Sequence, residues 1–320
     1  MAQAVTVYRW DDEGAPQIVD GKPSEYINLF KKCLVEGYGE KQGLGWLVQD
    51  ESPLNQISFI NAGSGGSFVF GSESGGDLAG EKIKMQCCQS FVDFDNLIQP
   101  SPFSLYRTNY SGTFKDWMII GTNSAFYFVI KKENQTKPSN LRYGTYPMFF
   151  VGDFKPLTPG DQSLFIFWGG HSGSDHTSPS SAQYISGQIV DGQMSTILRT
   201  YTMDSPPLEV KCTIKNLIGN GRHNSKDSII KKQTPEITFL SPNYLSVSSR
   251  DYHYDDYAEN NNSVTNPLLR GIIPGLYVSQ QTGFYDELLY FIKKINGVDY
   301  FNIPSTDDAA SAVWINLEEW

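Results

Sequence analysis

The chain has 320 residues, and its 25 basic and 35 acidic side chains give a formal net charge of −10 at pH 7. An acidic chain without a run of Lys or Arg repels phosphate groups, which argues against nucleic-acid binding and against adhesion to an anionic membrane. The sequence has no apolar run of about 20 residues, the length that a membrane-spanning helix requires.

The residue types point to β structure. Phe, Tyr and Trp make up 13 % of the chain and favour pleated, half-buried surfaces, while 29 Gly and 17 Pro mark turns. We therefore expect a mainly β fold of sandwich or barrel-like type. We expect a small α+β domain over residues 1–100 and a larger β-rich domain over 101–320, with the boundary near Pro100 to Pro102.

A strand at residues 4–10 is followed by the one clear helical pattern, over residues 24–36. Ser24 is the expected N-cap, and Glu25 suits the positive start of a helix. The apolar stripe consists of Ile27, Phe30 and Leu34. Gly37 stands where a left-handed residue ends a helix.

Four glycines, Gly37, Gly39, Gly43 and Gly45, crowd the stretch CLVEGYGEKQGLGW. A phosphate-binding loop places its glycines before a helix, so that free N–H groups meet the anion. Here the glycines follow the helix, and no GK[ST] sequence is present. The stretch is therefore expected to be a turn and not a nucleotide site.

Short strands fill the next part of the chain. QISFINAG and GSFVFGS flank a turn at Gly63 to Gly66, and KIKMQCCQSFVDF and SPFSLYRTN continue the pattern. DWMIIGTNSAFYFVIKKE predicts a hairpin around Gly121 to Ser124. MFFVGDFKPLTPGDQSLFIFWGG predicts two strands around Pro156 to Asp161.

Near the C-terminal end, FIKKINGVDYFNIP has an Asn296-Gly297 pair between alternating segments, the pattern of a type I′ hairpin. GFYDELLYFIKK is predicted as a strand because this turn fixes its register. An amphipathic helix is the alternative prediction for this segment, since four apolar residues share a helical face: Tyr285, Leu288, Leu289 and Ile292. SAVWINLEEW is predicted as a last strand.

Three polar stretches, 169–181, 216–234 and 251–263, predict long loops that either contact a partner or stay mobile. In the first, His171, Asp175 and His176 would be metal ligands, but a Ser/Gly loop offers no rigid support for them. In the third, Asp251 to Asp256 is rich in carboxylates.

That acidic stretch does not fit an EF-hand, because it lacks the required glycine and has Asn262 at the twelfth position, where the loop needs Glu. We expect no metal in either loop.

The four cysteines, Cys33, Cys87, Cys88 and Cys212, have no zinc-site spacing, and we expect reduced packing residues. The start MAQAVTVYRWDDEG lacks the features of a secretory signal, so we expect synthesis in a cytosol without export. No nucleophile elbow is present, and no acid, base and nucleophile set is evident. The sequence thus predicts no catalytic, cofactor-binding or metal-binding residue and favours a protein that is not an enzyme.

Five stretches together resemble a family of uncharacterised virion structural proteins of tailed phages and prophages. In chain order they are TVYRWDDEGAP, INLFKKCLVEGYGEKQGLGW, AFYFVIKKE, FFVGDFKPLTPGD and LLRGIIPGLYV. The Asn-rich stretch around residues 216–263 departs from the family's pattern. The resemblance implies a virion component of the tail or head-tail region, present in several symmetric copies, and it carries no catalytic residue or cofactor.

Three functions are therefore weighed. The first is a structural component of a bacteriophage virion (tail, head-tail or baseplate) that contacts other copies of itself and neighbouring virion proteins. The second is a receptor-binding or capsid-decorating protein whose exposed aromatic residues stack on host surface glycans. The third is a cell-wall hydrolase that uses a pair of its carboxylates. Fibrous receptor-binding proteins usually carry repeats, and none is present here, so the first is favoured.

Overall fold

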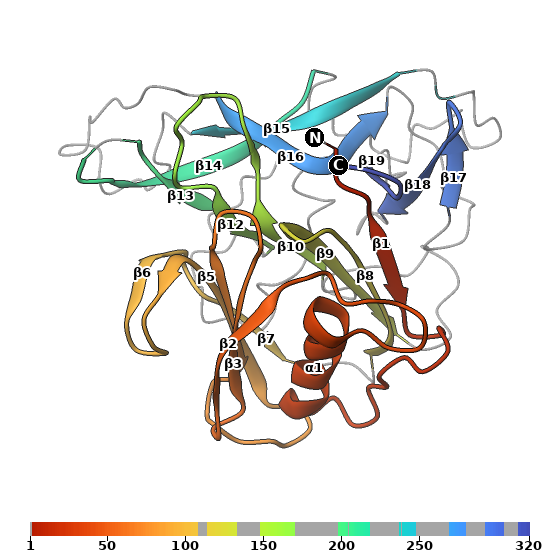
Figure 1. Ribbon diagram of the computed structural model, residues 1–320, viewed down its shortest axis with the longest axis vertical. Helices are drawn as coiled ribbons and strands as arrows, with labels where there is room; N and C mark the ends of the chain where they lie inside the picture. The colour runs from red at the N-terminus through yellow and green to blue at the C-terminus, as the bar shows by residue number, and fades with distance from the viewer. Residues whose placement is uncertain are drawn as a thin grey trace, which may run out of the picture.

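The protein is described by a computed structural model that covers residues 2–107, 114–132, 148–169, 198–203, 205–217, 237, 239–247, 269–279, 292–303 and 313–320. Within them the fold is mainly β, with antiparallel sheets and one short helix, as the sequence predicts. In the described ranges the sheets are open and do not close into a barrel. They are stacked in layers along the longest axis (Figure 1).

The central sheet has the order β1-β8-β9-β10-β12. Its strands are β1 (Thr6–Arg9), β8 (Phe114–Gly121), β9 (Ala125–Lys132), β10 (Met148–Asp153) and β12 (Phe165–Trp168). The predicted hairpin around residues 121–124 is confirmed, because β8 and β9 pair antiparallel across it. The two strands predicted around residues 156–161 are β10 and β12, and they pair with each other.

Below the central sheet in Figure 1 lies the first sheet, of order β2-β3-β4-β5-β6, with β7 also paired to β5. Its strands are β2 (Leu47–Ser52), β3 (Gln56–Ile60), β4 (Ser67–Ser72), β5 (Lys82–Phe91), β6 (Leu97–Pro100) and β7 (Ser104–Arg107). The strands predicted in QISFINAG and GSFVFGS, on either side of a turn, are β3 and β4, and they pair antiparallel.

Above the central sheet lies the third sheet, of order β13-β14-β15-β16-β19-β18-β17, with β11 paired to β16. Its strands are β11 (Lys155–Pro156), β13 (Arg199–Tyr201), β14 (Glu209–Lys215), β15 (Leu240–Val247), β16 (Leu269–Ser279), β17 (Ile292–Ile295), β18 (Val298–Ile303) and β19 (Val313–Asn316). β17 and β18 form the predicted hairpin, and Asn296 and Gly297 both have the positive φ that a type I′ turn requires. Of the segment GFYDELLYFIKK, the described part is a strand from Ile292 onward.

The central sheet is buried on both faces. Ile119, Phe126 and Phe128 point into the core that it shares with the first sheet. Their neighbours Ile120 and Tyr127 point into the core that it shares with the third sheet. Because side chains alternate along a strand, burial of both faces requires unbroken apolar runs such as AFYFVI, and this accounts for much of the aromatic content.

The helix begins with α1 (Pro23–Phe30) and continues as the π-helical segment η1 (Lys31–Glu36), so the predicted span is confirmed. Phe30 lies between the two lower layers, with ring centroids 4.8 Å from Phe70 of the first sheet and 5.3 Å from Phe128 of the central sheet. Aromatic pairs at such distances stabilise a core beyond their burial.

The predicted N-cap is wrong by two positions, since Lys22 is the N-cap and Pro23 is the first helical residue. The Glu25 carboxylate accepts the backbone N–H groups of residues 19–22. It thereby fixes the chain before the helix. Ser24 instead donates its N–H and its hydroxyl to the Asp77 carboxylate.

The lower core contains residues from both sides of the predicted boundary near residue 100, for example Phe68 and Phe126, whose ring centroids are 5.8 Å apart. β1, from the predicted first domain, belongs to the central sheet. The two predicted parts therefore share this core, and the division into 1–100 and 101–320 stays a prediction.

Candidate functional site

The glycine-rich stretch after the helix folds back on the end of that helix. Leu44 N–H donates to the carbonyl of Cys33 at 3.0 Å, and Trp46 N–H donates to the carbonyl of Leu34 at 3.0 Å. These bonds satisfy carbonyls that the end of a helix leaves unpaired. Gly37 has a φ of 81° and lies so close to Lys41 that an added Cβ would be 2.3 Å from the carbonyl oxygen of Lys41. The prediction that the glycine-rich stretch forms a turn is confirmed.

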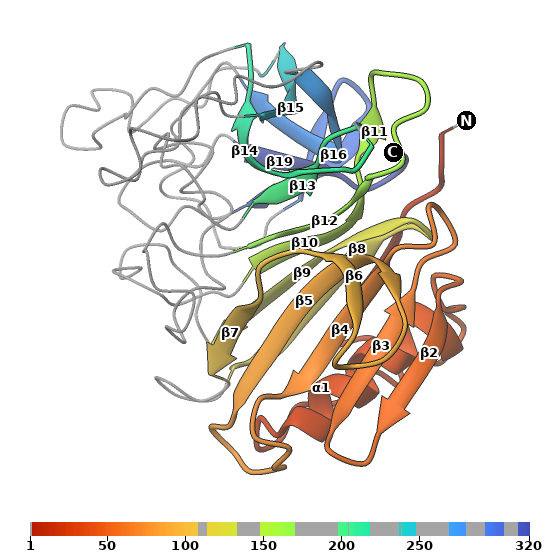
Figure 2. The same ribbon diagram turned by 90° about the vertical axis from the view of Figure 1, so that its left-hand side faces the viewer.

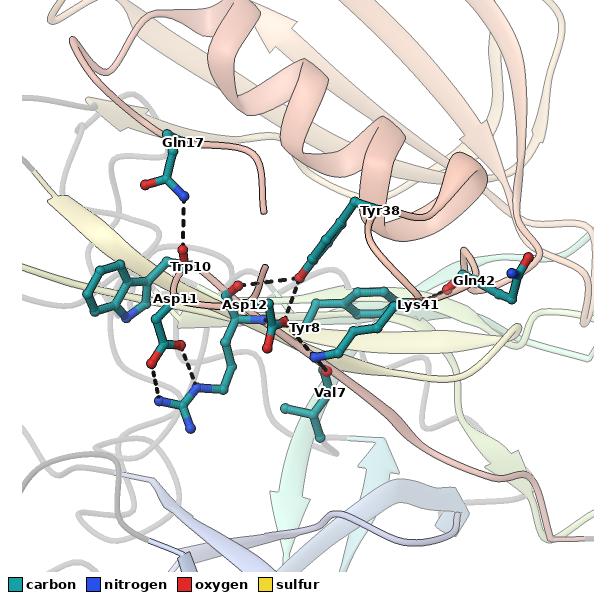
Figure 3. Close-up of polar contacts among 10 residues, drawn as sticks. Val7, Tyr8, Trp10, Asp11, Asp12, Gln17, Tyr38, Lys41 and Gln42 are labelled. Carbon is teal, nitrogen blue, oxygen red and sulfur yellow. Dashed lines mark hydrogen bonds and ion pairs between the residues drawn. The ribbon is translucent and has the colours of Figure 1, made fainter. Parts of the chain in front are cut away.

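This turn also brings a cluster of polar side chains together beside β1 (Figure 3). One oxygen of the Asp12 carboxylate accepts from Lys41 Nζ at 2.5 Å, from Arg9 N–H at 2.7 Å and from the Tyr38 hydroxyl at 2.8 Å. Lys41 Nζ also donates to the carbonyl of Val7 at 2.8 Å. Asp12 and its three donors thus join the glycine-rich turn to the first strand.

The hydrogen bonds and the burial of this cluster shift the pKa values of Asp12 and Tyr38. Burial acts to raise the pKa of the Asp12 carboxyl, but hydrogen bonds from Lys41, the Arg9 backbone and Tyr38 outweigh it and keep that pKa below its usual range. Burial and the hydrogen bond to Asp12 raise the pKa of Tyr38 well above its usual value. At neutral pH Asp12 is an ionised carboxylate with three hydrogen bonds to one of its oxygens, and Tyr38 is a weak acid, an arrangement poorly suited to proton transfer.

A second ionic contact lies inside the protein, between the central and third sheets. The Arg270 guanidinium binds the Asp161 carboxylate through Nε at 2.8 Å and Nη2 at 2.7 Å, and its Nη1 donates to the carbonyl of Tyr201 at 2.6 Å. The side-chain exposures are 2 % for Arg270 and 0 % for Asp161. This planar, bidentate geometry fixes orientation as well as charge.

A third contact, at Asp153, joins the first sheet to the central sheet. Its carboxylate accepts from the Ser64 hydroxyl at 2.6 Å and from Ser64 N–H at 2.8 Å. The turn that carries Ser64 is also bonded to the β8–β9 turn, through Ala62 N–H to the Asn123 carbonyl. Burial raises the pKa of Asp153 despite the bonds from Ser64.

Ser64 beside Asp153, like Ser24 beside Asp77, places a hydroxyl against a carboxylate, which invites comparison with a catalytic serine. A serine nucleophile, however, normally takes its proton from an adjacent base that a third group orients. The four histidines of the chain, His171, His176, His223 and His253, all lie outside the described residues. Among the residues described, Ser64 and Asp153 are therefore best explained as a contact between layers.

All four cysteines are free and buried, as predicted. Burial raises the pKa of the Cys88 and Cys212 thiols to about 12 and that of the Cys33 and Cys87 thiols further, so the reactive thiolate form is disfavoured at neutral pH. Over the ranges that the structure describes, no group of three His, Cys, Asp or Glu residues is placed to hold a metal ion.

Two candidate sites weighed from the sequence, namely His171, Asp175 and His176 and the acidic residues 251–256 with Asn262, lie outside the described residues. The polar contacts at Asp12, Asp153 and Asp161 were not foreseen. The stretches that carry the virion-protein resemblance contain Asp12, Lys41, Asp153, Asp161 and Arg270, but the resemblance assigns these residues no role.

A scan against models of known protein families and a search of curated proteins both find no match to this sequence. In the described part of the chain no helix is both long enough and apolar enough to cross a membrane.

Proposed function

We propose that this chain is a structural component of a bacteriophage virion, in the tail, head-tail or baseplate region. It acts through protein–protein interfaces in a symmetric assembly. Its partners are other copies of itself and neighbouring virion proteins. It is located in the virion, and it catalyses no reaction.

This proposal rests mainly on the contacts between the stretches that resemble the virion family. TVYRWDD supplies Asp12, and CLVEGYGEK supplies its partners Tyr38 and Lys41. In the same way TPGD supplies Asp161, and LLRG supplies its partner Arg270. The stretches that resemble the virion family thus meet in pairs at contacts that hold the architecture together. Motifs of this kind define a scaffold rather than a reaction.

The positions of the aromatic residues support assembly over the glycan-binding alternative. In the described part, Phe, Tyr and Trp side chains mostly line the two large cores, and the strongly exposed one is Phe239, at 48 %. Glycan recognition by stacking requires several exposed rings on one surface. The aromatic content of the described part is therefore explained by a sheet that is buried on both faces.

Mass spectrometry of purified particles tests the proposal. Particles are produced from a host that carries the complete phage or prophage genome, and they are purified through two successive density gradients. The chain is expected in a fixed ratio to the major capsid protein in every gradient fraction that holds particles. An abundant cytosolic host protein serves as the control for contamination. A chain that is absent, or that separates from the particles like the host protein, contradicts the proposal.

A further inference from the structure

Three apolar side chains are exposed on loops that are linked to one another near the start of α1. Val19 precedes α1, Leu54 is in the β2–β3 turn and Leu78 is in the β4–β5 loop, with exposures of 59 %, 57 % and 68 %. Both turns lie at the lower end in Figures 1 and 2. Single exposed apolar residues are ordinary, but three on converging loops form a surface that requires an explanation. We call these three residues the tip surface.

The loops that carry the tip surface are held by specific polar contacts. Asp77, next to Leu78, binds Ser24 at the start of α1 at 2.9 Å and 2.7 Å. Asn55, next to Leu54, donates to the Gly75 carbonyl at 3.1 Å, and an added Cβ at Gly75 would be 3.3 Å from Leu54. Glu25 accepts Val19 N–H at 3.2 Å. The apolar side chains are thus presented by fixed backbone, which lowers the entropy cost of binding a partner.

The charges around the tip surface define the chemistry of that partner. Segments 19–25, 52–55 and 73–82 contain five carboxylates and two lysines, a net charge of −3. Asp20 and Glu73 keep side-chain exposures of 51 % and 42 % although each is paired with a lysine. An acidic rim around apolar residues is complementary to a surface that is apolar at its centre and basic at its rim.

A second copy of this chain fits less well, because a chain with a net charge of −10 repels its own acidic tip. We infer that the tip surface docks onto a different protein of the same assembly, one that presents an apolar patch with a basic rim. The inference rests on the proposed function and adds the chemistry of one neighbour.

The test compares variants in particles. The double variant Leu54→Asp/Leu78→Asp adds charge at the centre of the tip surface, and Leu47→Asp, at 64 % exposure on β2, is the matched control. All these side chains are exposed, so the melting temperature should shift by no more than about 2 °C in either variant. The amount of the double variant in purified particles is expected to fall about tenfold or more, while the control stays at the wild-type level.

A second variant tests the charge of the neighbour. Asp20→Lys/Glu73→Lys reverses the acidic rim and is expected to reduce incorporation and to weaken its dependence on salt. Normal incorporation of the Leu54/Leu78 variant beside wild-type chain would overturn the inference but leave the proposed function standing. Absence of the wild-type chain from particles would overturn both. The purified wild-type chain could also associate with itself, and Leu54→Asp could abolish this association. That result would identify a second copy of the chain as the partner of the tip surface and would overturn the inference.

Discussion

Asp161 and Arg270 lie 109 positions apart in the chain and form a bidentate ion pair in the interior of the protein. Asp161 lies between β11 of the third sheet and β12 of the central sheet, and Arg270 is the second residue of β16. The pair therefore fixes the segment that connects the two sheets to the third sheet. The carbonyl of Arg270 also accepts Leu157 N–H at 2.9 Å. One arginine thereby positions the backbone of β13 and of the segment between β11 and β12.

Loss of one partner of this pair is expected to be costly. Arg270→Met leaves the Asp161 carboxylate buried without a cation, and we expect the free energy of unfolding to fall by about 3–5 kcal/mol. Urea unfolding followed by tryptophan fluorescence measures it. Lys32→Met is the control, because Lys32 and Glu36 form an exposed pair at 2.6 Å, where a change of no more than about 0.5 kcal/mol is expected. Similar losses in the two variants would contradict a structural role for the buried pair.

Local patterns predicted much of the fold. The Asn296-Gly297 turn fixed the β17–β18 hairpin because few residues other than Asn and Gly adopt its backbone conformation. The helix over 24–36 followed from its apolar spacing. Serine is a frequent cap and therefore favours Ser24, whereas Pro23 prefers the first helical position and points to Lys22 as the N-cap.

The contacts between layers could not be predicted, because they depend on how strands far apart in the sequence are stacked. Nothing near Asp153 in the sequence indicates Ser64, 89 positions away. The aromatic residues illustrate the same limit, because their abundance in the sequence is compatible both with a buried core and with a protein–protein interface. Only the alternation of Phe126 and Tyr127 between two cores shows that, in the described part, most of them fill the interior.

The backbone of Gly37 gives a second prediction. Its φ of 81° and ψ of 174° lie in a region that is essentially reserved for glycine, and an added Cβ would be 2.3 Å from the Lys41 carbonyl oxygen. Gly37→Ala is expected to lower the free energy of unfolding by more than about 3 kcal/mol. Gly65 has the same φ but nothing within 4 Å of an added Cβ, so Gly65→Ala should cost only about 1–2 kcal/mol. Equal losses would show that crowding at Gly37 is unimportant.

The pKa of Asp12 leads to a prediction about the stability of the protein at low pH. Its folded-state pKa lies below the unfolded value, so its contribution to stability is present above the unfolded pKa of about 3.9 and is lost as pH falls through the folded pKa. Asp12→Asn is expected to lose about 1–2 kcal/mol at pH 7, since the hydrogen bonds to the charged carboxylate are weakened. The difference from wild type should shrink as pH falls below about 4. Chemical unfolding at a series of pH values measures it, and a difference independent of pH would contradict an ionised Asp12.

Asp153 is expected to show the opposite trend. Burial raises its folded-state pKa above the unfolded value, so the stability it contributes is fully present below about pH 3.9 and is lost as pH rises through the folded pKa. Asp153→Asn removes this titration while keeping one acceptor for Ser64. Relative to wild type, the variant should therefore be least stable in acid and should gain on wild type as pH rises towards neutrality. The same series of unfolding measurements provides the comparison, with Asp12→Asn as the variant of opposite slope. If both variants changed with pH in the same direction, the hydrogen bonds from Ser64 would outweigh burial, and a raised pKa of Asp153 would be contradicted.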